Sequence, residues 1–356
     1  MNEDFLDSLN RTFGTFTFTR LVNFSKFKMP KNLSAANPSL RKIAAKKASP
    51  ASTQAAAPIA PDGLAQSSPK KTKKIFQIYF EPHQLDGLDS KFTPLNNEKY
   101  ADPLREFSVF ERLAERKALL KVSLWGALSW RFGSKTGLTG QAFHQAIDQN
   151  PGFDLYYCNP FPEHEALFAN GWQQGITAHP AFNELCRAVI EAAGQDTKVL
   201  TAIQPSVSFS ACNYFVACPE FWASYLPWVR SFVNRARANL PSPVLSVLDS
   251  PISDPRNLHA GSTYWPFIIE RLLPLYLKST GQKFKTHRLS LPANEARLNS
   301  HLLRLREMKD VAHRTQSPWL YACWQNYRNL YLLQTSGREW SSKYLPLINP
   351  VEVVFW

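Results

Sequence analysis

From residue 75 onward, the chain alternates between short apolar runs and longer stretches in which apolar residues recur at helical spacing. Runs of β-branched and aromatic residues bounded by turn residues predict strands, whereas apolar positions near a 3.6-residue spacing predict helices. The predicted strands are 75–80, 121–129, 153–158, 198–203 and 213–217, with an edge strand at 351–356. The predicted helices are 103–120, 139–149, 180–193, 219–238, 263–277, 294–308 and 319–333.

Several single residues sharpen these boundaries. Thr139 is placed to cap the start of its helix, and Gly194 stands where a helix ends in the left-handed conformation. Pro227 is expected to kink the helix that contains it.

Strands separated by helices predict an α/β fold with a mainly parallel sheet flanked by helices and an aromatic helical part at about 280–356. We expect residues 75–356 to form a single domain. In such a sheet the ligand site lies at the carboxyl ends of the strands. The loops that follow Phe80, Ser129, Cys158 and Ile203 are therefore where chemistry is expected.

Composition excludes several classes of protein. The 356 residues include 10 Trp, 12 Tyr and 24 Phe, which is too many for a chain without a core. With 14 Gly and 5 Cys, the chain is neither collagen-like nor a small disulfide framework. The cysteines show no C-x-x-C pair, which favours reduced, buried thiols in a cytoplasmic protein. No stretch is apolar enough for a membrane span, and the acidic N-terminus is not typical of a secretory signal.

The net charge of +13 is concentrated in a tail. Residues 1–74 hold 13 Lys and Arg against 4 Asp and Glu, whereas residues 75–356 hold 28 against 24. Residues 32–68 are rich in Ala, Ser, Pro and Lys and lack aromatic residues, so we expect a disordered basic tail over 1–74. Met29 offers a second start, which leaves translation of residues 1–28 open. Such a tail suits an anionic membrane face better than nucleic acid, given the balanced charge of the body.

Two strand-end loops carry groups suited to a nucleotide. Asn96 and Asn97 offer hydrogen-bonding edges for a base or a sugar. Arg131 and Lys135 follow the second strand in a glycine-containing loop, where two cations could hold a diphosphate. The spacing excludes a P-loop, because Ser134 separates the glycine from the lysine. A solvated loop and a basic surface turn are the structural alternatives.

Other residues suggest a sugar pocket and an acid–base group. Asp154 lies in an apolar run, where it would pair with a cation, bind a ribose hydroxyl, hold a metal or simply occupy a turn. Glu270 lies on an apolar helix, either paired with Arg271 or presented to an incoming hydroxyl. Aromatic, amide and imidazole groups of the kind that contact sugars come from Trp172, Gln173, His179 and Asn213.

The blocks Asp154–Pro162, Asn170–Gly175 with His179-Pro180, Asn213–Trp222 and Phe267–Leu273 together resemble bacterial glycosyltransferases of cell-surface polysaccharide loci. The resemblance covers roughly residues 75–280 and implies a GT-A-like, Rossmann-like domain. In that class an Asp-x-Asp motif commonly binds a divalent metal, Mn²⁺ or Mg²⁺, on the diphosphate. Here Asp154 is followed by Leu155 and Tyr156, so only the first acid is present and the metal stays open.

The resemblance implies transfer of a sugar from a nucleotide donor to a hydroxyl of a glycan or lipid-linked acceptor, at the cytoplasmic face of the inner membrane. In this reading Asn96, Asn97, Arg131 and Lys135 bind the donor. Asp154 orients the ribose or a metal, and Glu270 is the base. Trp172, Gln173, His179 and Asn213 would contact the sugar or acceptor. A glycan-binding or assembly protein without catalysis is the alternative, and it would not bind nucleoside diphosphates.

Overall fold

A computed structural model of the chain describes residues 72–100, 102–179, 181–253, 260–281, 283–350 and 352–356. These residues all belong to the compact unit Ser67–Trp356. The predicted tail therefore lies outside the described residues, apart from its last three positions. Lys73 and Lys74 belong to the first strand, which begins two residues before the predicted boundary.

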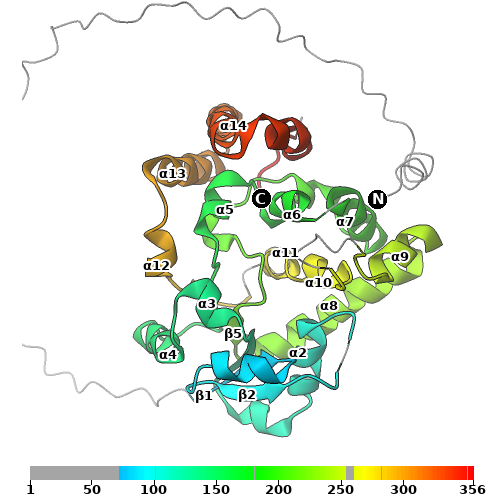
Figure 1. Ribbon diagram of the computed structural model, residues 1–356, viewed down its shortest axis with the longest axis vertical. Helices are drawn as coiled ribbons and strands as arrows, with labels where there is room; N and C mark the ends of the chain where they lie inside the picture. The colour runs from blue at the N-terminus through cyan, green and yellow to red at the C-terminus, as the bar shows by residue number, and fades with distance from the viewer. Residues whose placement is uncertain (1–71, 101, 180, 254–259, 282, 351) are drawn as a thin grey trace, which may run out of the picture. The chain divides into compact units, whose positions relative to one another are not determined.

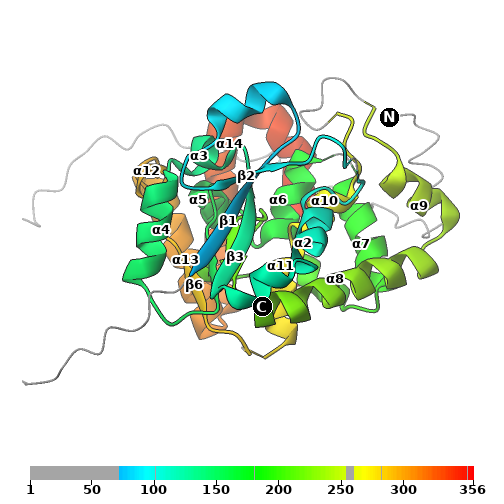
Figure 2. The same cartoon turned by 90° about the horizontal axis from the view of Figure 1, so that it is seen from below.

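The sheet has six strands in the order β2-β1-β3-β5-β4-β6 (Figures 1 and 2). Only β5 runs antiparallel to its neighbours, and the other neighbouring pairs are parallel. The predicted α/β class with a mainly parallel sheet is thus confirmed. The strands are β1 (Lys73–Tyr79), β2 (Thr93–Asn96), β3 (Leu124–Ser129), β4 (Leu155–Tyr157), β5 (Phe215–Ala217) and β6 (Thr286–Arg288).

Four of the predicted strands are confirmed, and the strand predicted at 198–203 is wrong. Residues Thr197–Leu200 form a 3-10 helix, η3, and Ile203 makes only an isolated bridge to Phe355. Side chains explain the difference. Asp196 accepts a hydrogen bond from the backbone N–H of Lys198, which stabilises the turn. Asn170 Nδ2 also donates to the carbonyls of Val199, Leu200 and Ala202. In a sheet, these carbonyls would instead accept hydrogen bonds from a neighbouring strand.

The predicted helices exist, with shifted ends. The stretch 103–120 divides into α2 and the 3-10 helix η2, and 263–277 divides into α10 and α11. Thr139 caps α4 by accepting from the N–H of Ala142, and Gly194 has a φ of 71° after α7, as the sequence predicts. The helix α8 continues through Pro227. Among the described residues, no helix is both long and apolar enough to cross a membrane.

The helices before the middle of the chain are η1 (Pro82–Gly87), α2 (Glu106–Ala114), η2 (Lys117–Lys121), α3 (Phe132–Thr136), α4 (Gly140–Gln149), α5 (Pro162–Leu167), α6 (Gly171–Ala178) and α7 (Phe182–Ala192). The later ones are η4 (Ser206–Ser208), α8 (Pro219–Asn239), α9 (Ser242–Asp249), α10 (Trp265–Ile269), α11 (Leu272–Ser279), α12 (Pro292–Glu295), α13 (Ser300–Thr315) and α14 (Pro318–Ile348).

Helices cover both faces of the sheet, with α4 on one side and α2, α8 and α11 on the other (Figure 2). Successive side chains of β3 point to opposite faces of the sheet, because the strand is pleated. Leu124 and Leu128 pack in one cluster with Phe143 of α4. Trp125 stacks on Trp222 of α8 with ring centroids 4.3 Å apart. Helices α13 and α14 lie away from β1 and β2, at the other end of the unit (Figure 1).

Glycine 126 allows β3 to lie close to the antiparallel strand β5. A Cβ atom added at Gly126 would come within 2.6 Å of the carbonyl oxygen of Phe215. Any larger residue would separate these two strands, so this position fixes the centre of the sheet.

Candidate active site

One edge of the sheet gathers most of the predicted polar residues. The carboxyl ends of β1, β2 and β3 lie at this edge because the three strands are parallel. The amino end of β5 lies there too, since β5 is antiparallel to β3. Asn97, Arg131 and Asn213 each lie within two residues of one of these strand ends. Sequence reasoning placed these groups at a common edge without knowing the direction of β5.

A cavity of about 410 Å³ lies beyond the ends of β1 and β2. Asn97 lines it, and its position is fixed because its N–H donates to the carbonyl of Tyr79 and its side-chain oxygen accepts from Arg112. Asn96 closes the turn by accepting from the N–H of Glu98. The lining residues are Phe80, Asn97, Glu98, Tyr100, Asp102, Pro103, Arg105, Gly261 and Thr263.

The ring of Tyr100 is the main aromatic surface available in this cavity. The residue is 55% exposed, and the guanidinium of Arg112 lies 4.3 Å from its ring centre. The cation supports one face of the ring, which favours a fixed ring orientation. Phe80 contributes a second ring to the same cavity. A planar base is a ligand that such rings accept by stacking.

Arg105 brings a cation to the cavity in a strained backbone conformation. Its φ is 52° with a ψ of −120°, a region that residues with a Cβ seldom adopt. Such strain costs about 1–3 kcal/mol and is concentrated at functional sites. The guanidinium donates to Ser262 Oγ at 3.0 Å, which leaves further N–H groups of the fork for an anion.

Glu106 follows Arg105 directly and is the first residue of α2. Its negative charge acts on the carboxyl of Glu270, the C-cap residue of α10. Burial and the negative charge of Glu106 raise the pKa of the Glu270 carboxyl to about 7, although Arg271 and Lys135 oppose the shift. Glu270 is nevertheless partly exposed. A carboxyl with this pKa can accept a proton at neutral pH and return it.

Lys135 lies on α3, the short helix that follows β3, and its charge acts on the Glu270 carboxyl. Its Nζ is 5.7 Å from the ring centre of Tyr214 and 6.0 Å from that of Phe161. The Tyr214 hydroxyl is 2.9 Å from Ser129 Oγ, and burial raises its pKa well above 10, so it stays protonated. Asn294 donates to the carbonyl of Lys135 and thereby holds α3 in place.

Lys135 therefore lies near enough to Glu270 for its charge to affect the carboxyl, and Arg131 and Asn213 lie at this edge of the sheet. Arg131 is exposed beside the Trp130 ring, at 5.9 Å. Asn213 is only 8% exposed and directly precedes Tyr214. Sequence reasoning missed Tyr100, Arg105 and Glu106. Nothing in their local pattern separates them from an ordinary loop and helix start, because their significance comes from the fold and from a backbone angle.

Asp154 does not lie with these residues, which corrects its predicted role of orienting the ribose or a metal. It directly precedes β4, so it lies at the amino end of a strand that is parallel to β3, at the opposite edge. Its Oδ2 accepts from the backbone N–H of Lys285 at 2.8 Å, and its carbonyl accepts from Cys218. Asp154 is thus a strand-end residue that joins β4 to the chain before β6.

Two predicted sugar contacts, Trp172 and His179, are wrong because their rings are buried, and a third, Gln173, lies at another cavity. Trp172 is 3% exposed and belongs to the core. The His179 ring is buried and stacks on Phe267 with centroids 4.0 Å apart. Gln173 accepts from the backbone N–H of Ala169, and it lines a different cavity, of about 450 Å³, beside η3 and the end of α14.

A metal bound through Asp154 does not fit these residues. The Asp154 carboxylate is engaged with the backbone and lies away from the cations expected to meet the diphosphate. Across the described ranges, no three His, Cys, Asp or Glu side chains are grouped so as to hold a metal ion. Arg105 and Lys135 are the groups that can offset phosphate charge here.

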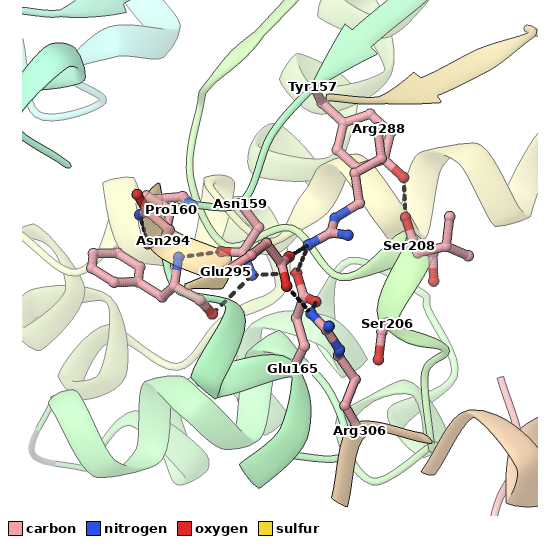
Figure 3. Close-up of polar contacts among 12 residues, drawn as sticks. Tyr157, Asn159, Pro160, Glu165, Ser206, Ser208, Arg288, Asn294, Glu295 and Arg306 are labelled. Carbon is pink, nitrogen blue, oxygen red and sulfur yellow. Dashed lines mark hydrogen bonds and ion pairs between the residues drawn. The ribbon is translucent and has the colours of Figure 1, made fainter. Parts of the chain in front are cut away.

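A buried ion network supports the loop that carries Phe161 (Figure 3). Glu165 is fully buried and pairs with Arg288 at 2.6 Å, and Asn159 donates to the same carboxylate oxygen at 2.8 Å. Arg306 pairs with Glu295 at 2.7 Å, which joins α12 and α13 to the network. Asn159 also donates to the carbonyl of Phe161, the residue whose ring lies beneath Lys135.

Comparison of the chain with protein-family models, with curated proteins and with solved structures found no match.

Proposed function

We propose that the protein is a glycosyltransferase of GT-A-like type that uses a nucleotide-sugar donor. The mainly parallel α/β sheet and a cavity at its carboxyl edge suit a nucleotide. The observation that carries the proposal is the cavity beyond the carboxyl ends of β1 and β2, which is lined by the exposed ring of Tyr100 and by Arg105. The pKa of the partly exposed Glu270 carboxyl, raised to about 7 by burial and by the charge of Glu106, supports it. Transfer to a hydroxyl is assisted by a base that takes up the proton and by cations that offset the charge of the leaving diphosphate.

In the proposed reaction, the ring of Tyr100 stacks on the base, and Asn97 and Phe80 complete the wall. Arg105 and Lys135 contact the diphosphate, with Arg131 at the rim. Glu270 takes the proton from the acceptor hydroxyl as its oxygen bonds to the anomeric carbon. The bond between that carbon and the phosphate oxygen breaks, and the electron pair leaves with the nucleoside diphosphate, whose charge the cations offset.

The acceptor in this proposal is a glycan or glycolipid of surface polysaccharide synthesis, reached at the cytoplasmic membrane face. Of the predicted residues, Arg131 and Lys135 keep a role at the diphosphate in this proposal, and Glu270 keeps the role of base. Asn97 contributes through its position in the cavity wall. The roles first given to Asp154, Trp172, Gln173 and His179 are not part of the proposal.

A panel of nucleotide sugars and nucleoside diphosphates tests the proposal. At least one nucleoside diphosphate should raise the melting temperature of the protein, and its sugar conjugate should release that diphosphate during incubation. Arg105→Ala should weaken this binding, whereas Arg304→Ala on the exposed face of α13 should not. If no compound in the panel raises the melting temperature or is turned over, the proposal is overturned and a glycan-binding protein without catalysis is favoured.

A further inference from the structure

A third cavity, of about 710 Å³, lies between the edge of the sheet and α11. The side chains on its sheet side are those of Tyr157 and Thr286, from β4 and β6. Its size lies within the range of small-molecule sites. The lining residues are Phe153, Tyr157, Pro205, Ser208, Pro274, Leu277, Lys278, Gly281, Phe284, Lys285, Thr286 and Trp356.

Most of this lining is apolar, and much of it is aromatic. The rings are those of Phe153 and Tyr157, which lie at or next to β4, of Phe284 before β6, and of Trp356 at the end of the sequence. The Tyr157 hydroxyl already donates to the carbonyl of Val207, so this residue offers its ring to the cavity and not a free donor. Such a lining favours a hydrocarbon or aromatic body over a strongly hydrated ligand.

Two lysines give the cavity a positive charge. In the described part of the chain, neither Lys278 nor Lys285 forms a side-chain ion pair or hydrogen bond. The Lys278 ammonium lies 4.7 Å from the Trp356 ring centre. Partial burial lowers the pKa of the Lys278 ammonium. The negative charge of Asp196 partly offsets this shift, although the two side chains, both among the described residues, form no ion pair. A partly desolvated ammonium without a carboxylate partner favours an anion.

We infer that this cavity binds an amphiphilic anion, with the apolar tail against the aromatic rings and a phosphate or carboxylate head on Lys278 and Lys285. The inference stands apart from the proposed transfer reaction. It requires neither a nucleotide nor Glu270, and none of the residues that line the first cavity lines this one.

Dodecyl phosphate, kept below its micelle concentration, is the probe for a binding titration by calorimetry. We expect saturable binding to the full chain, at least tenfold weaker in Lys278→Ala/Lys285→Ala. Lys117→Ala/Lys121→Ala removes the same charge from the exposed turn η2 and should bind as the unmodified protein does. Dodecanoate in place of dodecyl phosphate distinguishes a carboxylate head from a phosphate head. Inorganic phosphate and dodecanol, each lacking one half of the ligand, should bind at least tenfold more weakly.

A measurement on the unmodified protein avoids any effect of substitution on folding. Dodecyl phosphate should slow the acetylation of Lys278 and Lys285 by a soluble reagent, read by peptide mass spectrometry, but not that of Lys117 and Lys121. Absence of saturable binding overturns the inference. So does equal protection of all four lysines, or equal weakening in both double variants.

Discussion

Glu106 raises the pKa of Glu270, although the two carboxylates come from different helices, α2 and the end of α10. The fold thereby places like charges together, which is unfavourable for stability and useful for proton transfer. Lys135 and Arg271 limit the effect, so that the pKa comes to about 7.

Glu106→Gln should move the pH dependence of turnover to lower pH. Removing the negative charge of Glu106 lowers the pKa of Glu270, so the base is ionised at a lower pH. The acid limb of log kcat/KM against pH reports that pKa and should shift toward acid with an unchanged plateau. Glu184→Gln, an exposed position on α7, is the matched control. An acid limb that stays in place would separate Glu106 from the site.

The raised pKa of Glu270 also predicts a pH dependence of stability. Between about pH 4.5 and 7 the folded state holds a proton that the unfolded state has released, so stability falls as pH rises through this window. Glu270→Gln removes this loss and should stabilise the protein at pH 8, on the order of 1–2 kcal/mol after allowance for partial exposure. Urea unfolding of both proteins at pH 5 and pH 8 measures it. A variant that is equally destabilised at both pH values would contradict the assignment.

Arg105 offers a comparison of strain with ligand binding. Arg105→Gly and Arg105→Ala both remove the guanidinium, so both should weaken nucleoside diphosphate binding about tenfold or more. Only glycine relieves the backbone strain at a φ of 52°, so the Gly variant should be about 1 kcal/mol more stable than the Ala variant. Calorimetry and urea unfolding give the two quantities. Equal stability of the two variants would remove the strain argument.

The ion network beneath the site should be sensitive to loss of a single partner. Arg288→Met leaves the fully buried Glu165 without its shortest ion pair and should cost about 3–5 kcal/mol of unfolding free energy. Arg304→Met, at an exposed position on α13, should change stability by less than about 0.5 kcal/mol. A small cost for Arg288→Met would mean that Glu165 takes up a proton or water instead.

Local pattern predicted much of the fold because strands such as 75–80 and helices such as 219–238 carry strong periodicity. The strand predicted at 198–203 failed because Asn170, distant in sequence, takes up the carbonyls of that stretch. Such a competing contact is not visible in the residues of the stretch itself. The short strand β2, which contains Pro94, gave too few residues for a pattern.

The site was predictable only where a residue follows directly on a strand that the pattern reveals. Arg131 meets this condition, Lys135 lies on the short helix that follows the same strand, and Glu270 was found through its apolar surroundings. Asp154 was misplaced because it stands at the start of its strand, and the amino end of a strand parallel to β3 lies at the opposite edge of the sheet. Trp172 and His179 have the composition of a sugar pocket, yet the same side chains build a core when helices bury them.

Paired measurement of donor binding and turnover in Glu270→Gln tests the central claim most directly. The donor is the nucleotide sugar that the panel identifies, and release of its nucleoside diphosphate is the readout. The account predicts a dissociation constant within about threefold of the unmodified protein and turnover reduced at least about 10²-fold, with Glu184→Gln unchanged in both. Full turnover in Glu270→Gln would contradict it.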